Sequence, residues 1–253
     1  MKLTFLGTGT SQGVPVIACA CEVCTSLNTK DNRLRTSAML EVDEKIIVFD
    51  SGPDFRQQML REKVSKLDAI IFTHEHKDHV AGLDDVRAFN FITNKPIDVY
   101  ASHNVQIALK REFHYVFSEK DYPGIPKINL HTITNDSFRI NQTKFIPIEL
   151  LHYKLSVFGF RVNNLTYITD ANFIPEKEFD KIAGTDILVL NALRKKKHLS
   201  HFTLKEALGI IDKVKPKKAF LTHISHLMGL HDEVQNELPA NVFLAYDGLV
   251  VDC

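Results

Sequence analysis

Short apolar runs of strand length alternate along the chain with segments whose apolar residues recur at helical spacing. The first half predicts strands at 2–6, 36–42, 45–49, 67–72 and 97–100, and helices at 54–63, 80–89 and 105–113. The second half predicts strands at 138–140, 144–150, 157–162, 165–169, 186–190 and 218–222, and helices at 175–182, 203–214 and 234–238. Residues 242–245 and 248–251 predict a closing hairpin around Tyr246 and Asp247.

Both halves therefore alternate strands with helices, and no linker or low-complexity segment separates them. The simplest α/β architecture that buries all these strands is a four-layer αββα sandwich, with two mixed sheets face to face and helices outside each. A chain of 253 residues with 44% hydrophobic residues can bury a large core, so we expect one domain over residues 1–253. Residues 115–128 predict an exposed excursion that either covers a site or contacts a second subunit.

Charge and hydropathy exclude several classes of partner. Lys and Arg number 31, as do Asp and Glu, so the net charge is zero and no overall field attracts nucleic acid or anionic lipid. The N-terminus reaches Gly7 before any long apolar region, and no run approaches the roughly 20 apolar residues of a membrane span. We expect a cytoplasmic protein without a membrane partner.

The segment from Thr73 to His79 carries the densest chemistry in the chain. His74, His76, Asp78 and His79 follow the predicted strand at 67–72, at the end where open α/β sheets place their chemistry. Neutral imidazoles and carboxylates are the ligands that hold Zn, Mn or Fe in open, catalytic sites. The cluster therefore predicts a catalytic metal site.

Further candidate ligands stand at the ends of other predicted strands. These are His152, Asp170 and His223, which bring the set to seven and suit two metal ions. Asp50 also ends a strand, and two interpretations stay open for it. It either accepts a hydrogen bond from a metal-bound imidazole or simply forms a turn.

Three of the four cysteines lie within six residues, as Cys19, Cys21 and Cys24. They are too close for ordinary disulfide pairing and suit a metal in a reducing compartment. A structural zinc takes four ligands, and His226, three residues after His223, is the expected fourth. Cys253 is expected to be a passive surface thiol.

His201 stands just before a predicted helix whose Thr203 and Glu206 have the spacing of a capping box. A helix N-terminus favours anions, so His201 is a candidate phosphate contact; a surface histidine is the alternative. The turn from Gly7 to Gly13 is a weak candidate for a phosphate cradle, because it lacks the Walker lysine.

This ordered set resembles the metallo-β-lactamase superfamily, whose hydrolases carry His-x-His-x-Asp-His after a strand, followed by a His, an Asp and a final His. The resemblance covers essentially the whole chain. It implies that one ion is held by His74, His76 and His152, the other by Asp78, His79 and His223, and that Asp170 bridges them. His76 stands where the oxygen-reducing diiron branch has Glu, so hydrolysis is the expected chemistry.

Four features resemble the PhnP-like branch, the phosphoribosyl cyclic phosphate phosphodiesterases. They are the Gly7–Gly13 turn, the three cysteines with His226, the Gly82–Arg87 segment and His201–Thr203. The resemblance implies two active-site divalent ions, Mn or Zn, one structural Zn and a small, cyclic phosphodiester as substrate. A hydroxide between the two ions would be the nucleophile. Asp78 and His201 are the expected catalytic residues, with His201 contacting the phosphate or protonating the leaving alkoxide. By analogy alone, a homodimer is the expected oligomeric state.

Three alternatives share these motifs. A tRNA 3′-processing endonuclease has the same ligand set and a His-x-Thr motif, but zero net charge and the lack of a Gly/Pro-rich arm argue against a nucleic-acid partner. Hydrolysis of a thioester or lactam on the same metals is the second. The third is a non-catalytic, metal-binding accessory protein of a biosynthetic pathway.

Overall fold

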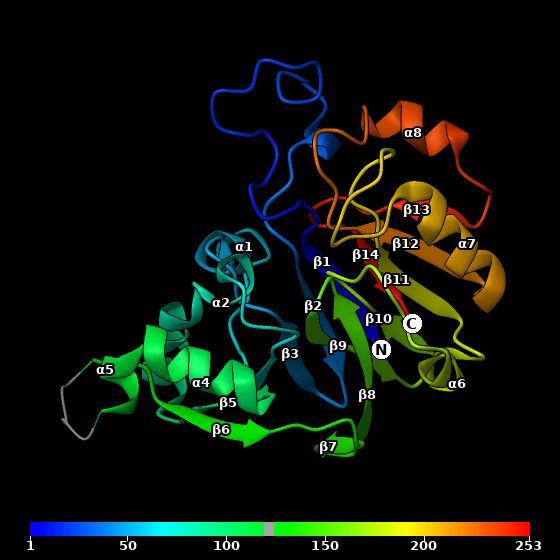
Figure 1. Cartoon of the computed structure of the whole chain (residues 1–253). Coiled ribbons are helices and arrows are strands. Elements are labelled where there is room, and N and C mark those ends of the chain that lie inside the picture. Colours follow the sequence, from blue (N-terminus) through cyan, green and yellow to red (C-terminus); the bar gives the residue numbers. More distant parts are fainter. Residues whose placement is uncertain (119–123) are drawn as a thin grey trace.

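Two mixed β-sheets pack face to face in the computed structural model, which describes residues 1–118 and 124–253 (Figure 1). Within these residues the first sheet has the order β14-β1-β2-β3-β4-β5-β6 and the second β13-β12-β11-β10-β9-β8-β7. The first comprises β1 (Lys2–Gly7), β2 (Ser37–Val42), β3 (Lys45–Phe49), β4 (Ala69–Ile71), β5 (Ile97–Ala101), β6 (Ile128–Thr132) and β14 (Val250–Asp252). The second comprises β7 (Phe138–Ile140), β8 (Thr143–His152), β9 (Leu155–Val162), β10 (Leu165–Tyr167), β11 (Ile187–Asn191), β12 (Lys218–Thr222) and β13 (Val242–Leu244).

Helices cover the outer face of each sheet (Figure 1). Outside the first sheet lie α1 (Phe55–Arg61), α2 (Lys77–Val80), α3 (Arg87–Thr93), α4 (His103–Glu112) and α5 (His114–Phe117). Outside the second lie α6 (Phe179–Ile182), α7 (Leu204–Val214) and α8 (His231–Glu237). The predicted four-layer αββα sandwich is confirmed. No helix in the described ranges combines the length and apolar character needed to cross a membrane.

The core between the sheets is built by alternation along the strands. In β3, Ile47 and Phe49 face the second sheet, whereas Val48 packs with the helices outside the first sheet. The Phe49 ring lies 4.8 Å from that of Tyr167 and 5.7 Å from that of Phe160, centroid to centroid, so aromatic contacts join the layers. The loops that extend from the strand ends are thereby held on a rigid frame.

The predicted hairpin at 242–251 is wrong, because its two strands belong to different sheets. β13 pairs in parallel with β12, while β14 pairs antiparallel with β1. The residues between them cross from one sheet to the other. Asp247 accepts hydrogen bonds there from the backbone N–H groups of Thr8 (2.9 Å) and Leu34 (2.7 Å). Tyr246 and Asp247 therefore form a crossover that is tied to β1 and its following loop.

The helix predicted at 80–89 is also wrong, since the chain forms α2, a 3₁₀ turn at Leu83–Val86 and then α3. Gly82 explains the break. Its N–H donates to the carbonyl of Ser51 at 2.8 Å, and a Cβ at this position would lie 2.1 Å from the carbonyl oxygen of Gly52. This close backbone approach holds the α2 segment against the loop after β3.

The region predicted as an excursion, 115–128, begins in α5 and ends where β6 starts, and residues 119–123 lie outside the described range. β6 itself was not predicted. Among the described strands it pairs with β5 alone, at the edge of the first sheet, and its side chains are half-buried or exposed, so the apolar pattern of a buried strand is absent.

Candidate metal centre

The candidate ligands meet because several strands end at the same rim of the sandwich. The segment 72–79 follows β4, His152 ends β8, Asp170 follows β10 and His223 follows β12. Asp170 and His223 have φ angles of 54° and 55°, in the left-handed region that non-glycine residues rarely adopt. Such backbone strain concentrates at functional sites, where the surrounding fold maintains it.

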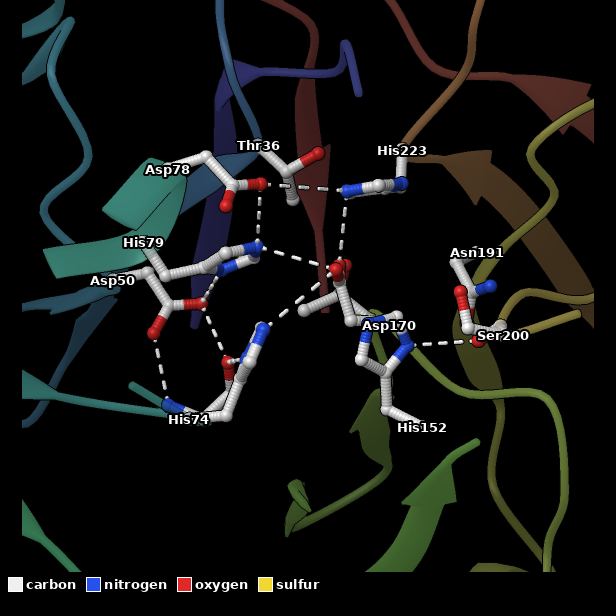
Figure 2. A network of polar contacts seen from close by, with 12 residues as sticks. Thr36, Asp50, His74, Asp78, His79, His152, Asp170, Asn191, Ser200 and His223 are labelled. Carbon is white, nitrogen blue, oxygen red and sulfur yellow. Dashed lines mark hydrogen bonds and ion pairs between the residues drawn. The ribbon is translucent and has the colours of Figure 1, made fainter. Parts of the chain in front are cut away.

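Asp170 lies at the centre of the cluster (Figure 2). Its carboxylate oxygens are 3.1 Å from Nε2 of His223, 3.4 Å from Nε2 of His79 and 3.8 Å from Nε2 of His74. The structure brings all seven predicted ligands together in two groups, each with its donor atoms within 4.8 Å of one another. One group is His74, His76 and His152, and the other is Asp78, His79, Asp170 and His223.

These donors fit bound cations. Among the described residues, Nε2 of His74, Nε2 of His79 and both ring nitrogens of His223 are buried without a hydrogen-bond partner, an arrangement that is costly unless another ligand satisfies them. Burial alone would lower the pKa of His223, but the Asp170 carboxylate raises it to about 9. The carboxylates thus attract positive charge to this spot. The imidazole and carboxylate set suits two divalent cations such as Zn or Mn.

Asp50 orients one of the candidate ligands from behind. It accepts a hydrogen bond from Nδ1 of His79 at 2.7 Å, and bonds of 2.8 Å each from the backbone N–H and the hydroxyl of Thr73. Because Nδ1 donates to Asp50, Nε2 of His79 is the nitrogen that faces Asp78 and Asp170. This geometry favours the orienting interpretation of Asp50 over the turn-forming one.

We expect Asp50→Asn to lower active-site metal affinity by about 10- to 100-fold, the usual effect of losing such an orienting carboxylate. Competition with a chelator would measure it. Asp98→Asn is the matched control, because Asp98 lies on β5 and pairs with His131 instead. Equal affinities in Asp50→Asn and the wild type would contradict an orienting role.

Two further supports at the rim were not predicted from the sequence. Nδ1 of His152 donates to the backbone carbonyl of Ser200 at 2.7 Å (Figure 2). Asn191 is the last residue of β11. Its side chain accepts a hydrogen bond from the Ala171 backbone N–H and donates one to the Ala171 carbonyl, both at 2.9 Å, and so holds the residue next to Asp170. A polar residue that ends an otherwise apolar strand is the signal that could have identified Asn191, whereas a backbone carbonyl leaves no signal in the sequence.

His201 lies beside the candidate ligands and not on the surface. It is only 8% exposed, and its ring centroid is 4.6 Å from those of both His223 and His152. Burial and the neighbouring His223 lower its pKa to about 2, so its imidazole is neutral. The predicted capping box of Thr203 and Glu206 is confirmed at the start of α7, immediately after His201.

The three cysteines and His226 form a separate group. Nδ1 of His226 lies 3.3 Å from the sulfurs of Cys19 and Cys21 and 3.5 Å from that of Cys24. The Cys24 backbone N–H and then His226 lower the pKa of Cys21 to about 6, which favours the thiolate that binds metal. The donor set is that of a closed structural zinc site.

The Gly7–Gly13 turn, which leads into the segment of the three cysteines, is joined through the backbone to the segment between His223 and His226. The backbone N–H of Thr10 donates to the carbonyl of Ile224 at 3.1 Å, and the backbone N–H of Ile224 donates to the carbonyl of Thr8 at 2.8 Å. Ile224 lies between His223 and His226, so the two groups of ligands share one anchored segment.

Comparison with known proteins identifies the family. The model of the beta-lactamase superfamily domain matches residues 45–224. The crystal structure of a diphosphatase from the PhnP family superposes with a TM-score of 0.93 at 40% identity, covering 100% of this chain and 97% of that one.

Two curated relatives are longer proteins. An octanoyltransferase of Porphyromonas gingivalis is 37% identical over 252 residues, 98% of this chain and 51% of that protein. A ribonuclease Z of Nostoc sp. is 30% identical over 166 residues, 64% of this chain and 46% of that protein. The chain thus spans about half the length of these curated relatives. The fold, the donor set and these similarities together show that the chain belongs to the metallo-β-lactamase superfamily and, within it, to the PhnP family.

Proposed function

We propose that this chain is a metal-dependent hydrolase that cleaves a small, cyclic phosphodiester. One observation carries the proposal: the buried carboxylate of Asp170 lies between two groups of imidazoles, and His201 stands at their edge as a further neutral imidazole. The PhnP-family structure, which is named as a diphosphatase, supports phosphoryl chemistry. The clustered cysteines, whose spacing suits a metal in a reducing compartment, support a cytoplasmic location.

In this proposal His74, His76 and His152 would hold one divalent ion, and Asp78, His79 and His223 would hold the other, with Asp170 available to both. Two such ions, Mn or Zn, supply a nucleophile at neutral pH and offset the negative charge that develops at phosphorus. The chain itself fixes the donors: Asp50 orients His79, the Ser200 carbonyl orients His152, and Asn191 holds the backbone next to Asp170. The cysteines and His226 would hold a third ion, Zn.

His201 has the position of a group that acts on the substrate. A neutral imidazole can donate its N–H to a phosphate oxygen, and it could protonate the departing alkoxide only after taking up a proton itself. A cavity of about 490 Å³ opens beside His76 and His152, a volume that suits a small molecule.

His201→Ala is expected to keep both active-site ions but to lower kcat about 100-fold, the lower end of what a general acid–base group contributes. Metal analysis and steady-state kinetics on the same sample separate the two effects. His114→Ala, on α5, is the control for removing an imidazole elsewhere. Unchanged turnover in His201→Ala would remove this residue from the reaction.

The proposed function is tested by assaying the Mn- and Zn-loaded protein on bis(p-nitrophenyl) phosphate, ribose cyclic phosphates, a diphosphate ester, a precursor tRNA and an acyl thioester. Selective cleavage of the small phosphodiesters supports the proposal. Preference for the tRNA, which the ribonuclease Z similarity favours, or for the thioester, which the octanoyltransferase similarity favours, would replace it. A protein that retains only the cysteine-bound zinc after metal supplementation would have the accessory role.

A further inference from the structure

We propose that Tyr153 and Leu199 form the walls of a site that holds a planar apolar group of the substrate, such as a nucleobase, beside the candidate metal centre. This inference rests on the proposed function, because it takes the reacting phosphate to lie among the candidate ligands. It adds a determinant of specificity that the ligand set alone does not provide.

The position of the two side chains is the first observation. Tyr153 is 48% exposed and Leu199 is 66% exposed. Both residues line the 490 Å³ cavity that opens on two candidate ligands. The cavity is lined by His76, His152, Tyr153, Lys154, Leu155, Leu199 and Ser200. Large apolar side chains left open to solvent at the mouth of a polar site indicate contact with a ligand.

The walls are held in place by Asn172. Its Oδ1 accepts a hydrogen bond from the Tyr153 backbone N–H at 2.6 Å, and its Nδ2 donates to the Leu199 carbonyl at 3.3 Å. The backbone N–H of Asn172 donates in turn to the carbonyl of Leu151 at 2.9 Å. Since the adjacent Ser200 carbonyl also bonds His152, the walls keep a defined position relative to a candidate metal ligand.

The backbone of Tyr153 is the second observation. Its φ angle is 58°, in the left-handed region, within the two-residue turn that joins β8 to β9. The turns before β8 and β10 place Asn141 and Asn163 in this conformation, which asparagine tolerates well. A bulky tyrosine there is a strained choice, and strained choices cluster at ligand-binding sites. The ring at the cavity mouth gives a reason for it.

The charge of the cavity fits a phosphorylated substrate. Lys154 is exposed, its Nζ lies 5.4 Å from the centroid of the Tyr153 ring, and the described residues that line the cavity include no carboxylate. Aromatic rings stack on nucleobases whatever the base, so a wall of this kind would select a planar group and not a particular base.

The experiment compares two substrates of the metal-loaded protein that share the reacting group, adenosine 2′,3′-cyclic phosphate and methyl ribofuranoside 2,3-cyclic phosphate. We expect kcat/KM to be about tenfold higher for the adenosine compound, because that is the gain in affinity expected from stacking one base. The gain should come from a lower KM, with kcat unchanged. Tyr153→Gly, which suits the left-handed backbone, should bring the ratio close to one, and Tyr153→Phe should preserve it. Phe91→Ala, which removes an exposed ring from α3, is the control that leaves the ratio unchanged.

Equal efficiency on the two substrates, or an unchanged ratio in Tyr153→Gly, would overturn the inference. So would a preference for the octyl ribofuranoside 2,3-cyclic phosphate over the adenosine compound, which would assign the walls to an aliphatic chain. If the wild type hydrolyses none of these compounds, the proposed function fails separately. The affinities of the protein for AMP and for ribose 5-phosphate, measured by calorimetry, then test the inference about Tyr153 and Leu199. Tighter binding of AMP that is lost in Tyr153→Gly supports the inference. Equal binding of the two compounds overturns it.

Discussion

Asp170→Asn is expected to lose both active-site metal ions while it keeps the zinc of the cysteine group. The Asp170 carboxylate is buried and lies within 3.8 Å of nitrogens from His74, His79 and His223. Asparagine has nearly the same shape but no charge, so two cations close together would repel each other without the anion between them. The fall in kcat/KM should exceed about 100-fold, since that is already the upper end for losing a group that only orients a ligand.

Metal analysis of the purified variant is the direct measurement, with one zinc per chain as the expected result. Circular dichroism and thermal unfolding would show that the fold is kept. Asp98→Asn again serves as the control for exchanging a carboxylate on a strand of the same protein. If Asp170→Asn retained two additional ions and normal turnover, Asp170 would have no place between them.

Cys21→Ser is expected to release the zinc of the cysteine group and to lower the free energy of unfolding, because a structural metal contributes its binding energy to folding. The loop from Thr8 to Thr10 pairs with Ile224, so loss of the zinc should also weaken metal binding at His223. Urea unfolding, zinc content and active-site metal affinity would be measured together.

Cys253→Ser provides a matched control, because Cys253 is the last residue and lies apart from the cysteine group. Because Cys253 is half-buried and packs against the core between the sheets, it controls for the loss of a thiol outside the cysteine group, and it should leave the zinc content unchanged. A Cys21→Ser protein with full zinc content and an unchanged urea midpoint would show that the thiols only pack together.

The sequence by itself was enough to predict the layers and the candidate ligands, because both depend on local patterns. Both halves of the chain alternate helices with strands that are apolar enough to be buried. Few architectures bury the apolar faces of all these elements, and the four-layer sandwich is the simplest of them. The segment from His74 to His79 brings its donors together through adjacency, and Asp170 and His223 stand directly after apolar runs. Close spacing likewise groups Cys19, Cys21 and Cys24.

Only the tertiary structure decided features that depend on partners distant in the sequence. Residues 242–251 look like a hairpin locally, but Asp247 bonds Thr8 and Leu34 and carries the chain between sheets. The sequence leaves two interpretations of Asp50 open, and the hydrogen bond between its carboxylate and His79 decides between them. The burial of His201 and the walls at Tyr153 and Leu199 arise where loops from different strands meet, and the Ser200 contact uses a backbone carbonyl that every residue has. Such contacts are set by three-dimensional packing, so no local pattern records them.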